Sequence, residues 1–178
     1  MAYPTVDAPY GLKPINLIGG QVYSGSTRQI PIASGYATNI FNGDVVKYVN
    51  TGTLEKDTGT TTATPVGVFL GCSFTDPSTS QLTFRQYYPA STAASDIVGY
   101  VVDDPDVLFK VALVSSGTTI AGYARTIVGN NLPLVQNSGS TVTGNSGVAG
   151  LGASAATTLS LPLRIIDLVP DTKDSDGN

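Results

Sequence analysis

The side chains that most often carry out catalysis are scarce in this chain of 178 residues. It contains no histidine, which removes the commonest general base and the usual nitrogen ligand of zinc. Without histidine, neither a Ser-His-Asp nor a Cys-His arrangement can form. Any remaining chemistry would have to come from carboxylates or from the single cysteine.

The carboxylates are few and lie mainly in sequence typical of turns. Glycoside hydrolysis needs only two acids at a set spacing, so a small hydrolase with paired aspartates stays open as a hypothesis. The only glutamate, Glu55, lies in a short predicted hairpin. The aspartates mostly occupy positions where their side chains hydrogen-bond to the backbone of a turn. We therefore expect no catalytic residue and no enzymatic activity.

Two acidic groups have the composition of a calcium loop. Asp103, Asp104 and Asp106 crowd one turn, and residues 174–178 read Asp-Ser-Asp-Gly-Asn. The second group is not followed by the bidentate glutamate that completes such a loop. We interpret them as a solvated turn and a solvated tail, and we expect no bound metal and no cofactor.

Cys72 is the only cysteine, so the chain has neither an intrachain disulfide nor a thiolate cluster for a metal. It lies inside an apolar run, where a free cysteine is usually a small buried hydrophobe. A reactive thiolate is the alternative interpretation.

Charged residues make up only 12% of the chain, about half the usual share, while 41% of the residues are apolar. The surface must therefore be rich in Ser, Thr, Asn and Gly. Interface cores are depleted of charge, so this composition suits a protein that neighbours partly cover. A polar, uncharged monomer surface explains the composition equally well.

The net charge of −4 argues against a surface that binds phosphates. The nine Lys and Arg residues are scattered along the chain, whereas nucleic-acid binding normally needs a basic patch. No apolar stretch reaches the length of a membrane span, and the first residues lack the pattern of a secretory signal. We expect no nucleic-acid partner, no membrane association, and synthesis in a cytoplasm.

The most apolar run, residues 65–74, reads Pro-Val-Gly-Val-Phe-Leu-Gly-Cys-Ser-Phe and predicts a central strand buried on both faces. Two glycines argue against a helix, because each would cost about 1 kcal/mol relative to alanine. In a strand they mark a bulge, a bend or a close backbone neighbour. We place Val66, Val68 and Leu70 on one face and Phe69 on the other. Phe69, Leu70 and Cys72 should be buried.

Turn signals recur about every ten residues between short strand-like runs, which is typical of an all-β protein. The strand-like runs are residues 22–23, 28–32, 45–49, 53–56, 65–74, 81–88, 96–102, 107–114 and 159–169. Asn42-Gly43 predicts a turn over residues 41–44. In residues 81–88, Leu82 and Phe84 alternate with Thr83 and Arg85, as in a half-buried strand. The best helix candidate, residues 118–127, is weak.

The chain divides into three predicted parts. Residues 1–21 contain three prolines and should form an extended arm, with disorder as the alternative. Residues 22–170 should form a small β-barrel or sandwich with a Gly/Ser/Thr-rich C-terminal excursion. Residues 171–178 should form a loose acidic tail. The arm carries the apolar residues that we expect to contact a capsid or another subunit: Tyr3, Tyr10, Leu12, Ile15 and Ile18.

Short segments spread over nearly the whole chain resemble the small virion structural proteins of tailed phages. They are residues 8–14 (Ala-Pro-Tyr-Gly-Leu-Lys-Pro), 19–20 (Gly-Gly), 23–25 (Tyr-Ser-Gly), 42–46 (Asn-Gly-Asp-Val-Val), 66–71 (Val-Gly-Val-Phe-Leu-Gly), 143–147 (Thr-Gly-Asn-Ser-Gly) and 161–166 (Leu-Pro-Leu-Arg-Ile-Ile). Proteins of this group are thought to decorate or cement the outside of the capsid.

The resemblance implies a non-catalytic role in the virion, with synthesis in the host cytoplasm. The implied partners are the major capsid protein and further copies of this chain, as a trimer ahead of a dimer. No functional residue is carried over from the family.

Two other functions remain open. A carbohydrate- or receptor-binding β-module of a phage tail or cell surface would need exposed aromatic residues, which the nine tyrosines could supply. The hydrolase with paired aspartates is the third hypothesis.

Overall fold

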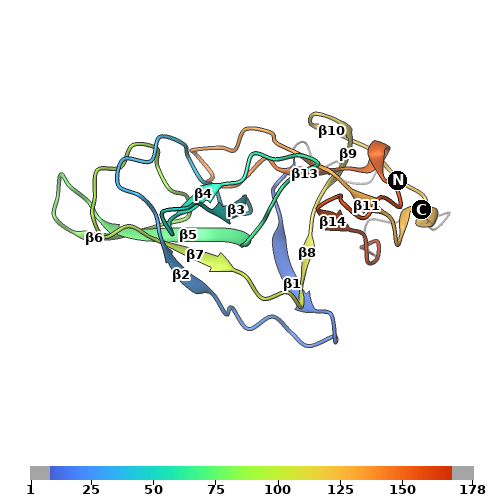
Figure 1. Cartoon of the computed structure of the whole chain (residues 1–178), viewed down its shortest axis with the longest axis horizontal. Helices are drawn as coiled ribbons and strands as arrows, with labels where there is room; N and C mark the ends of the chain where they lie inside the picture. Colours follow the sequence, from blue (N-terminus) through green and yellow to red (C-terminus); the bar gives the residue numbers. More distant parts are fainter. Residues whose placement is uncertain (1–8, 170–178) are drawn as a thin grey trace.

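Strand β5 (Gly67–Thr75) is the centre of the largest sheet in a computed structural model of the chain, which describes residues 9–169. It pairs with β7 (Val98–Val102) along one edge, and with β3 (Val45–Tyr48) and β6 (Leu82–Arg85) along the other. Strand β2 (Arg28–Pro31) lies outside β7, and β4 (Leu54–Lys56) lies outside β3. This antiparallel six-stranded sheet occupies one end of the molecule (Figure 1). The prediction of a central strand in this run is confirmed.

The two glycines of β5 lie where another backbone passes close by. A Cβ atom on Gly67 would lie 2.3 Å from the carbonyl oxygen of Val102, and one on Gly71 would lie 2.8 Å from that of Arg85. The pairing with β7 shifts register between Phe69 and Gly71, which is the signature of a β-bulge. The sequence interpretation of both glycines is confirmed.

Two core clusters lie on opposite faces of β5, and its side chains alternate between them. Phe69 and Cys72 belong to the first cluster, whereas Val68 belongs to the second. Two details of the prediction were wrong. Val66 packs against the same core cluster as Phe69. It precedes β5, so the alternation of side chains between the two faces of the strand does not apply to it. Leu70 is only partly buried because it lies at the bulge.

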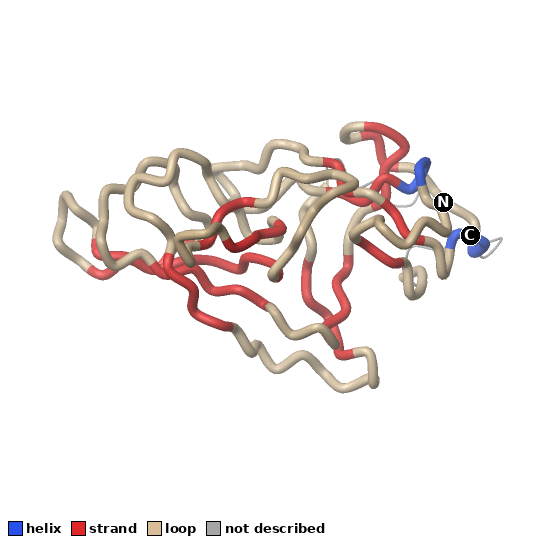
Figure 2. Tube along the Cα trace, viewed as in Figure 1, coloured by secondary structure: helices blue, strands red, loops and turns tan. Residues whose placement is uncertain are grey.

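The remaining strands form three small sheets, of which the first lies in the middle of the molecule and the other two lie at the end opposite the six-stranded sheet (Figures 1 and 2). The first joins β1 (Lys13–Leu17) to β8 (Val107–Lys110). The second contains β9 (Leu113–Ser116), β10 (Thr119–Ile120), β12 (Leu134–Val135) and β13 (Ala149–Leu151). The third joins β11 (Asn131–Leu132) to β14 (Leu163–Arg164). Two short 3₁₀ turns cover Arg125–Ile127 and Gly152–Ser154.

The fold is all-β, as predicted. Over residues 9–169 the sheets do not close into a barrel, so the sandwich-like alternative is the consistent one. No helix in this part of the chain is long and apolar enough to cross a membrane.

Four expectations from the sequence differ from the structure. Residues 107–114 are not one strand, because β8 and β9 belong to different sheets. Residues 22–23 contribute only an isolated bridge between Asn16 and Val22. Residues 118–127 form β10 and a 3₁₀ turn rather than a helix. Only Leu163–Arg164 of residues 159–169 is a strand, and it begins just after Pro162, which lacks the N–H that a ladder needs.

The boundary between arm and domain is not where we predicted it. The Gly11 N–H donates to the Val148 carbonyl at 3.1 Å, and the Leu12 N–H donates to the Gly43 carbonyl at 2.9 Å. Strand β1 then pairs with β8. Residues 9–17 therefore belong to the folded body. The predicted acidic tail and the first residues of the arm lie outside the described residues.

Candidate functional site

The five predicted contact residues do not form one surface. Tyr3 lies outside the described residues. Tyr10 is half-buried, and this burial raises the pKa of its hydroxyl group. Leu12 is 3% exposed and packs inside the second core cluster, because β1 is part of the body. Of the four contact residues within residues 9–169, only Ile15 and Ile18 are exposed apolar side chains.

Ile15 lies within β1, and Ile18 lies just after it. We call residues 15–22, which comprise this end of β1 and the tight turn that follows, the β1 loop. The Leu17 N–H donates to the Gln21 carbonyl at 2.8 Å, and the Ile18 N–H donates to the Asp106 carbonyl at 2.8 Å. Val22, also exposed, is bridged back to Asn16. The β1 loop thus holds three exposed aliphatic side chains on a fixed backbone.

A second apolar surface was missed by the sequence interpretation. On β6, Leu82 is 63% exposed and Phe84 is 69% exposed, although their alternation with polar residues predicted a half-buried strand. Ser73 of β5 lies opposite both Phe84 and Val98, and Val98 lies opposite Pro31 of β2. Directly opposite residues share a face, so these side chains form one row across four strands.

This row belongs to a face of the sheet that we call the outer sheet face. Its members, assigned by strand register, are Gln29, Pro31, Ser73, Thr75, Leu82, Phe84, Val98 and Tyr100. None of them carries a charge. The Tyr100 and Ser73 hydroxyls are hydrogen-bonded at 2.9 Å. Asp96 marks the rim, where its carboxylate accepts hydrogen bonds from Thr75 that lower its pKa.

The register explains why the apolar side of β6 points outward. Arg85 lies opposite Cys72, on the face of β5 that packs into the first core cluster, and its guanidinium carbon lies 5.9 Å from the Phe74 ring centroid. Leu82 and Phe84 must then take the opposite face. The signal that could have shown this is in β5, where polar Ser73 and Thr75 occupy the same face as Leu82 and Phe84.

The second core cluster covers only part of this side of the sheet. Val68, near one end of β5, packs there with Leu12, Val45, Leu134 and Val148. Beyond the bulge, no core cluster formed by residues 9–169 includes Val98, Tyr100 or Phe84. The row, in which Phe84 and Pro31 are exposed, Val98 is half-buried and Ser73 is buried, therefore continues a buried face beyond the second core cluster.

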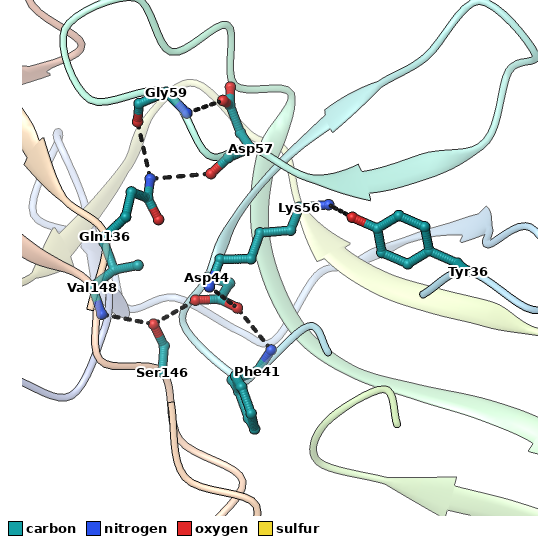
Figure 3. Close-up of polar contacts among 9 residues, drawn as sticks. All are labelled: Tyr36, Phe41, Asp44, Lys56, Asp57, Gly59, Gln136, Ser146 and Val148. Atoms are coloured by element: carbon teal, nitrogen blue, oxygen red, sulfur yellow. Dashed lines mark hydrogen bonds and ion pairs between the residues drawn. The ribbon is translucent and has the colours of Figure 1, made fainter. Parts of the chain in front are cut away.

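A buried polar cluster links the turn before β3 to the segment that leads into β13, and it centres on Asp44 (Figure 3). This fully buried carboxylate accepts from the Phe41 N–H at 2.9 Å and from the Ser146 hydroxyl at 2.6 Å. Its charge is balanced by the Lys56 ammonium at 3.0 Å. Ser146 in turn accepts from the Val148 N–H at 2.9 Å. Every polar atom named here is engaged, so the cluster serves to fix the chain.

Asp57 and Gln136 extend this pattern (Figure 3). Asp57 accepts from the Gly59 N–H at 2.8 Å and from the Thr64 N–H at 2.7 Å, which closes the Thr/Gly-rich loop. The Gln136 amide donates to the Asp57 and Gly59 carbonyls at 3.0 and 2.9 Å. The prediction that aspartates serve turn backbones is confirmed at Asp44 and Asp57.

In the acidic turn after β7, Asp103 and Asp104 both bind groups of this chain. Asp103 forms an ion pair with Arg28 at 2.5 Å, and Asp104 accepts from the Asp106 N–H at 2.9 Å. Within residues 9–169, no group of three or more His, Cys, Asp or Glu side chains is close enough to hold a metal ion. The other predicted acidic group, residues 174–178, lies outside the described residues.

Comparisons with known proteins do not assign this chain to a family. No family model matches it, and no curated protein or solved structure matches it. Its function must therefore be inferred from the sequence and from the surfaces described above.

Proposed function

We propose that this chain is a virion structural protein of a tailed phage, which binds the outside of the capsid shell and cements neighbouring capsid subunits without catalysis. The observation that carries the proposal is the outer sheet face, where a leucine and a phenylalanine lie exposed among uncharged neighbours. Interface cores are depleted of charge and enriched in aromatic residues. Contiguous apolar surface of this kind marks interaction sites.

The β1 loop supplies a second contact. Its exposed side chains, Ile15, Ile18 and Val22, replace the larger arm surface expected from the sequence. The β1 loop and β6 lie at well-separated places in the molecule (Figure 1). Two separate contact surfaces allow one chain to touch two neighbours, and a cement protein must do this.

The proposed partners are the major capsid protein and other copies of this chain, with a trimer favoured over a dimer by the family resemblance alone. The edges of the six-stranded sheet offer a further means of association. Among the strands of residues 9–169, β6 pairs only with β5, and exposed strand edges pair readily with other chains. We place the assembled protein in the virion.

The proposal is tested by co-sedimentation with purified empty capsids that lack this chain. We expect wild-type protein to sediment with the capsids and the double variant L82S/F84S to stay in solution. The matched control is L159S, because Leu159 is 90% exposed but lies outside the outer sheet face. This control should bind as wild type does, and all three proteins should share one unfolding midpoint.

Three results would contradict the proposal. Failure of the wild-type protein to bind capsids would contradict a role as a capsid cement protein. Glycan binding by the wild-type protein would favour the carbohydrate-binding alternative. Full binding by L82S/F84S would show that the outer sheet face is not the contact surface.

A further inference from the structure

Lys13 of β1 has an unusual set of partners for a lysine. Its side chain is half-buried, and its Nζ atom donates to the side-chain oxygen of Asn42, to the Asn42 carbonyl at 3.3 Å and to Asn145 Oδ1 at 3.0 Å. All three partners are amide oxygens, and none is a carboxylate. The amine is therefore held against the carboxamide of Asn42 without an ion pair to that residue.

The carboxamide of Asn42 is itself fixed in orientation. Its Nδ2 atom donates to the Leu70 carbonyl at 2.6 Å, so its Oδ1 atom must face Lys13. The backbone of Asn42 is held on both sides, by the Gly144 carbonyl at 3.0 Å and by the Ser146 N–H at 2.9 Å. Amine and carboxamide thus meet on a rigid frame, and such positioning makes a reaction between them effectively intramolecular.

The second asparagine supports the amine from its other side. Asn145 Oδ1 accepts from Lys13 and also from Gln86 Nε2 at 3.0 Å. Asn145 therefore positions the amine, whereas Asn42 offers both of its oxygens and a carboxamide group of fixed orientation. Asn42 is the better candidate for a reaction.

We propose that Lys13 and Asn42 form an intramolecular isopeptide bond. The lysine ammonium first loses a proton, and the amine lone pair attacks Cγ of Asn42. The Nζ–Cγ bond forms, a proton passes from Nζ to Nδ2, and the Cγ–Nδ2 bond breaks. Ammonia leaves and takes up the proton that lysine released, so the sum of lysine ammonium and carboxamide gives the cross-link and an ammonium ion. No oxidant or cofactor is needed.

The surroundings act on the amine in two opposing ways. Burial lowers the pKa of Lys13, which increases the fraction of reactive amine, whereas the negative charge of Asp44 raises it. The Asp44 carboxylate is engaged by Phe41, Lys56 and Ser146. Asp44 therefore holds the turn that carries Asn42, and it is not assigned a role in proton transfer.

The bond would give this chain a covalent link that its single cysteine cannot provide. It would join β1 to the turn that precedes β3, across a sequence separation of 29 residues. A cross-link of this kind stabilises the folded state by restricting the unfolded chain, as a disulfide does. This inference is independent of the proposed function.

The test is the intact mass of the purified, denatured full-length protein. We expect a mass lower than the sequence mass by one molecule of ammonia. The variants K13R and N42A should show their full sequence masses. The matched control N50A removes an asparagine of an exposed turn, keeps Lys13, Asn42 and Asn145, and should still lose ammonia. Trypsin should release a branched peptide in which residues 1–28 are joined to residues 29–47.

Three results would overturn the proposal. The first is a full sequence mass for the wild-type protein. The second is loss of ammonia without a branched peptide, because a succinimide at Asn42-Gly43 loses the same mass but leaves Lys13 free. The third is a branched peptide that joins Lys13 to Asn145.

Discussion

At the scale of single residues, Phe69 is the clearest test of where the core lies. Its side chain has no exposed surface and packs against the first core cluster from the middle of β5. Truncation to alanine should lower the free energy of unfolding by about 3–5 kcal/mol, because burial is lost and a cavity remains. Urea denaturation measures this change.

Phe84→Ala is the matched control, since it makes the same chemical change at a side chain that is 69% exposed. It should change the free energy of unfolding by less than about 0.5 kcal/mol. Equal losses in the two variants would contradict the assignment of inner and outer faces of the sheet.

Cys72 gives a second prediction at this scale. The residue is 1% exposed, and burial raises the pKa of its thiol from 9.0 to about 12, although Arg85 acts in the opposite direction. Thiol reagents should therefore react slowly with native protein and rapidly in urea. Fast labelling of native protein would show that this side of β5 is open.

The same shift gives a pH dependence with a definite sign. The raised pKa in the folded state means that the thiol proton contributes stability below pH 9.0, and this contribution is lost as the pH rises toward about 12. Urea unfolding between these two pH values should show a decline that is smaller in C72A. An identical decline in both proteins would contradict the burial of the thiol.

At the scale of elements, β1 makes the N-terminal segment part of the folded body, so deleting this segment affects stability. Leu12 is 3% exposed in the second core cluster, and β8 pairs with β1. Deleting residues 1–21 should therefore destabilise the whole body, and L12A alone should cost about 2–5 kcal/mol. Deletion of a detached extended arm, as the sequence predicts for residues 1–21, would instead leave the core folded.

To test whether the β1 loop contacts the capsid, the substitutions must leave the folded body intact. The double variant I15S/I18S alters two exposed side chains of the β1 loop and should keep the wild-type unfolding midpoint while weakening capsid binding. A midpoint that falls as far as that of L12A would mean that the β1 loop is part of the core.

How far the sequence predicts these elements depends on whether the signal is local. The turn over residues 41–44 was predictable from Asn-Gly, and it is present with Gly43 at φ +96° and the Asp44 N–H bonded to the Phe41 carbonyl at 2.9 Å. Strand β5 was predictable from its uninterrupted apolar run. Such signals depend on a few neighbouring residues.

Exposure was not predictable in the same way. Alternation in β6 shows that Leu82 and Phe84 share a face, but only the pairing with β5 decides whether that face points inward. The Asp44 cluster likewise depends on Ser146, which lies 102 residues away in the sequence. The main candidate surface was therefore missed, and of the predicted contacts that the structure describes only Ile15 and Ile18 are exposed.

At the scale of the whole molecule, the low share of charged residues and the uncovered outer sheet face agree with a protein that works by contact. Within residues 9–169 one edge of β6 has no partner strand, and closed symmetric oligomers can bury such edges. We expect light scattering to show a homo-oligomer, with a trimer ahead of a dimer. A stable monomer at high concentration would contradict self-association of the free protein.

Membership of a virion is the central claim, and one measurement tests it most directly. The number of copies of this chain in purified virions can be determined by quantitative mass spectrometry against the major capsid protein. We expect many copies per particle, at a fixed ratio to the major capsid protein. Absence of the chain from virions whose genome encodes it would contradict the proposed function.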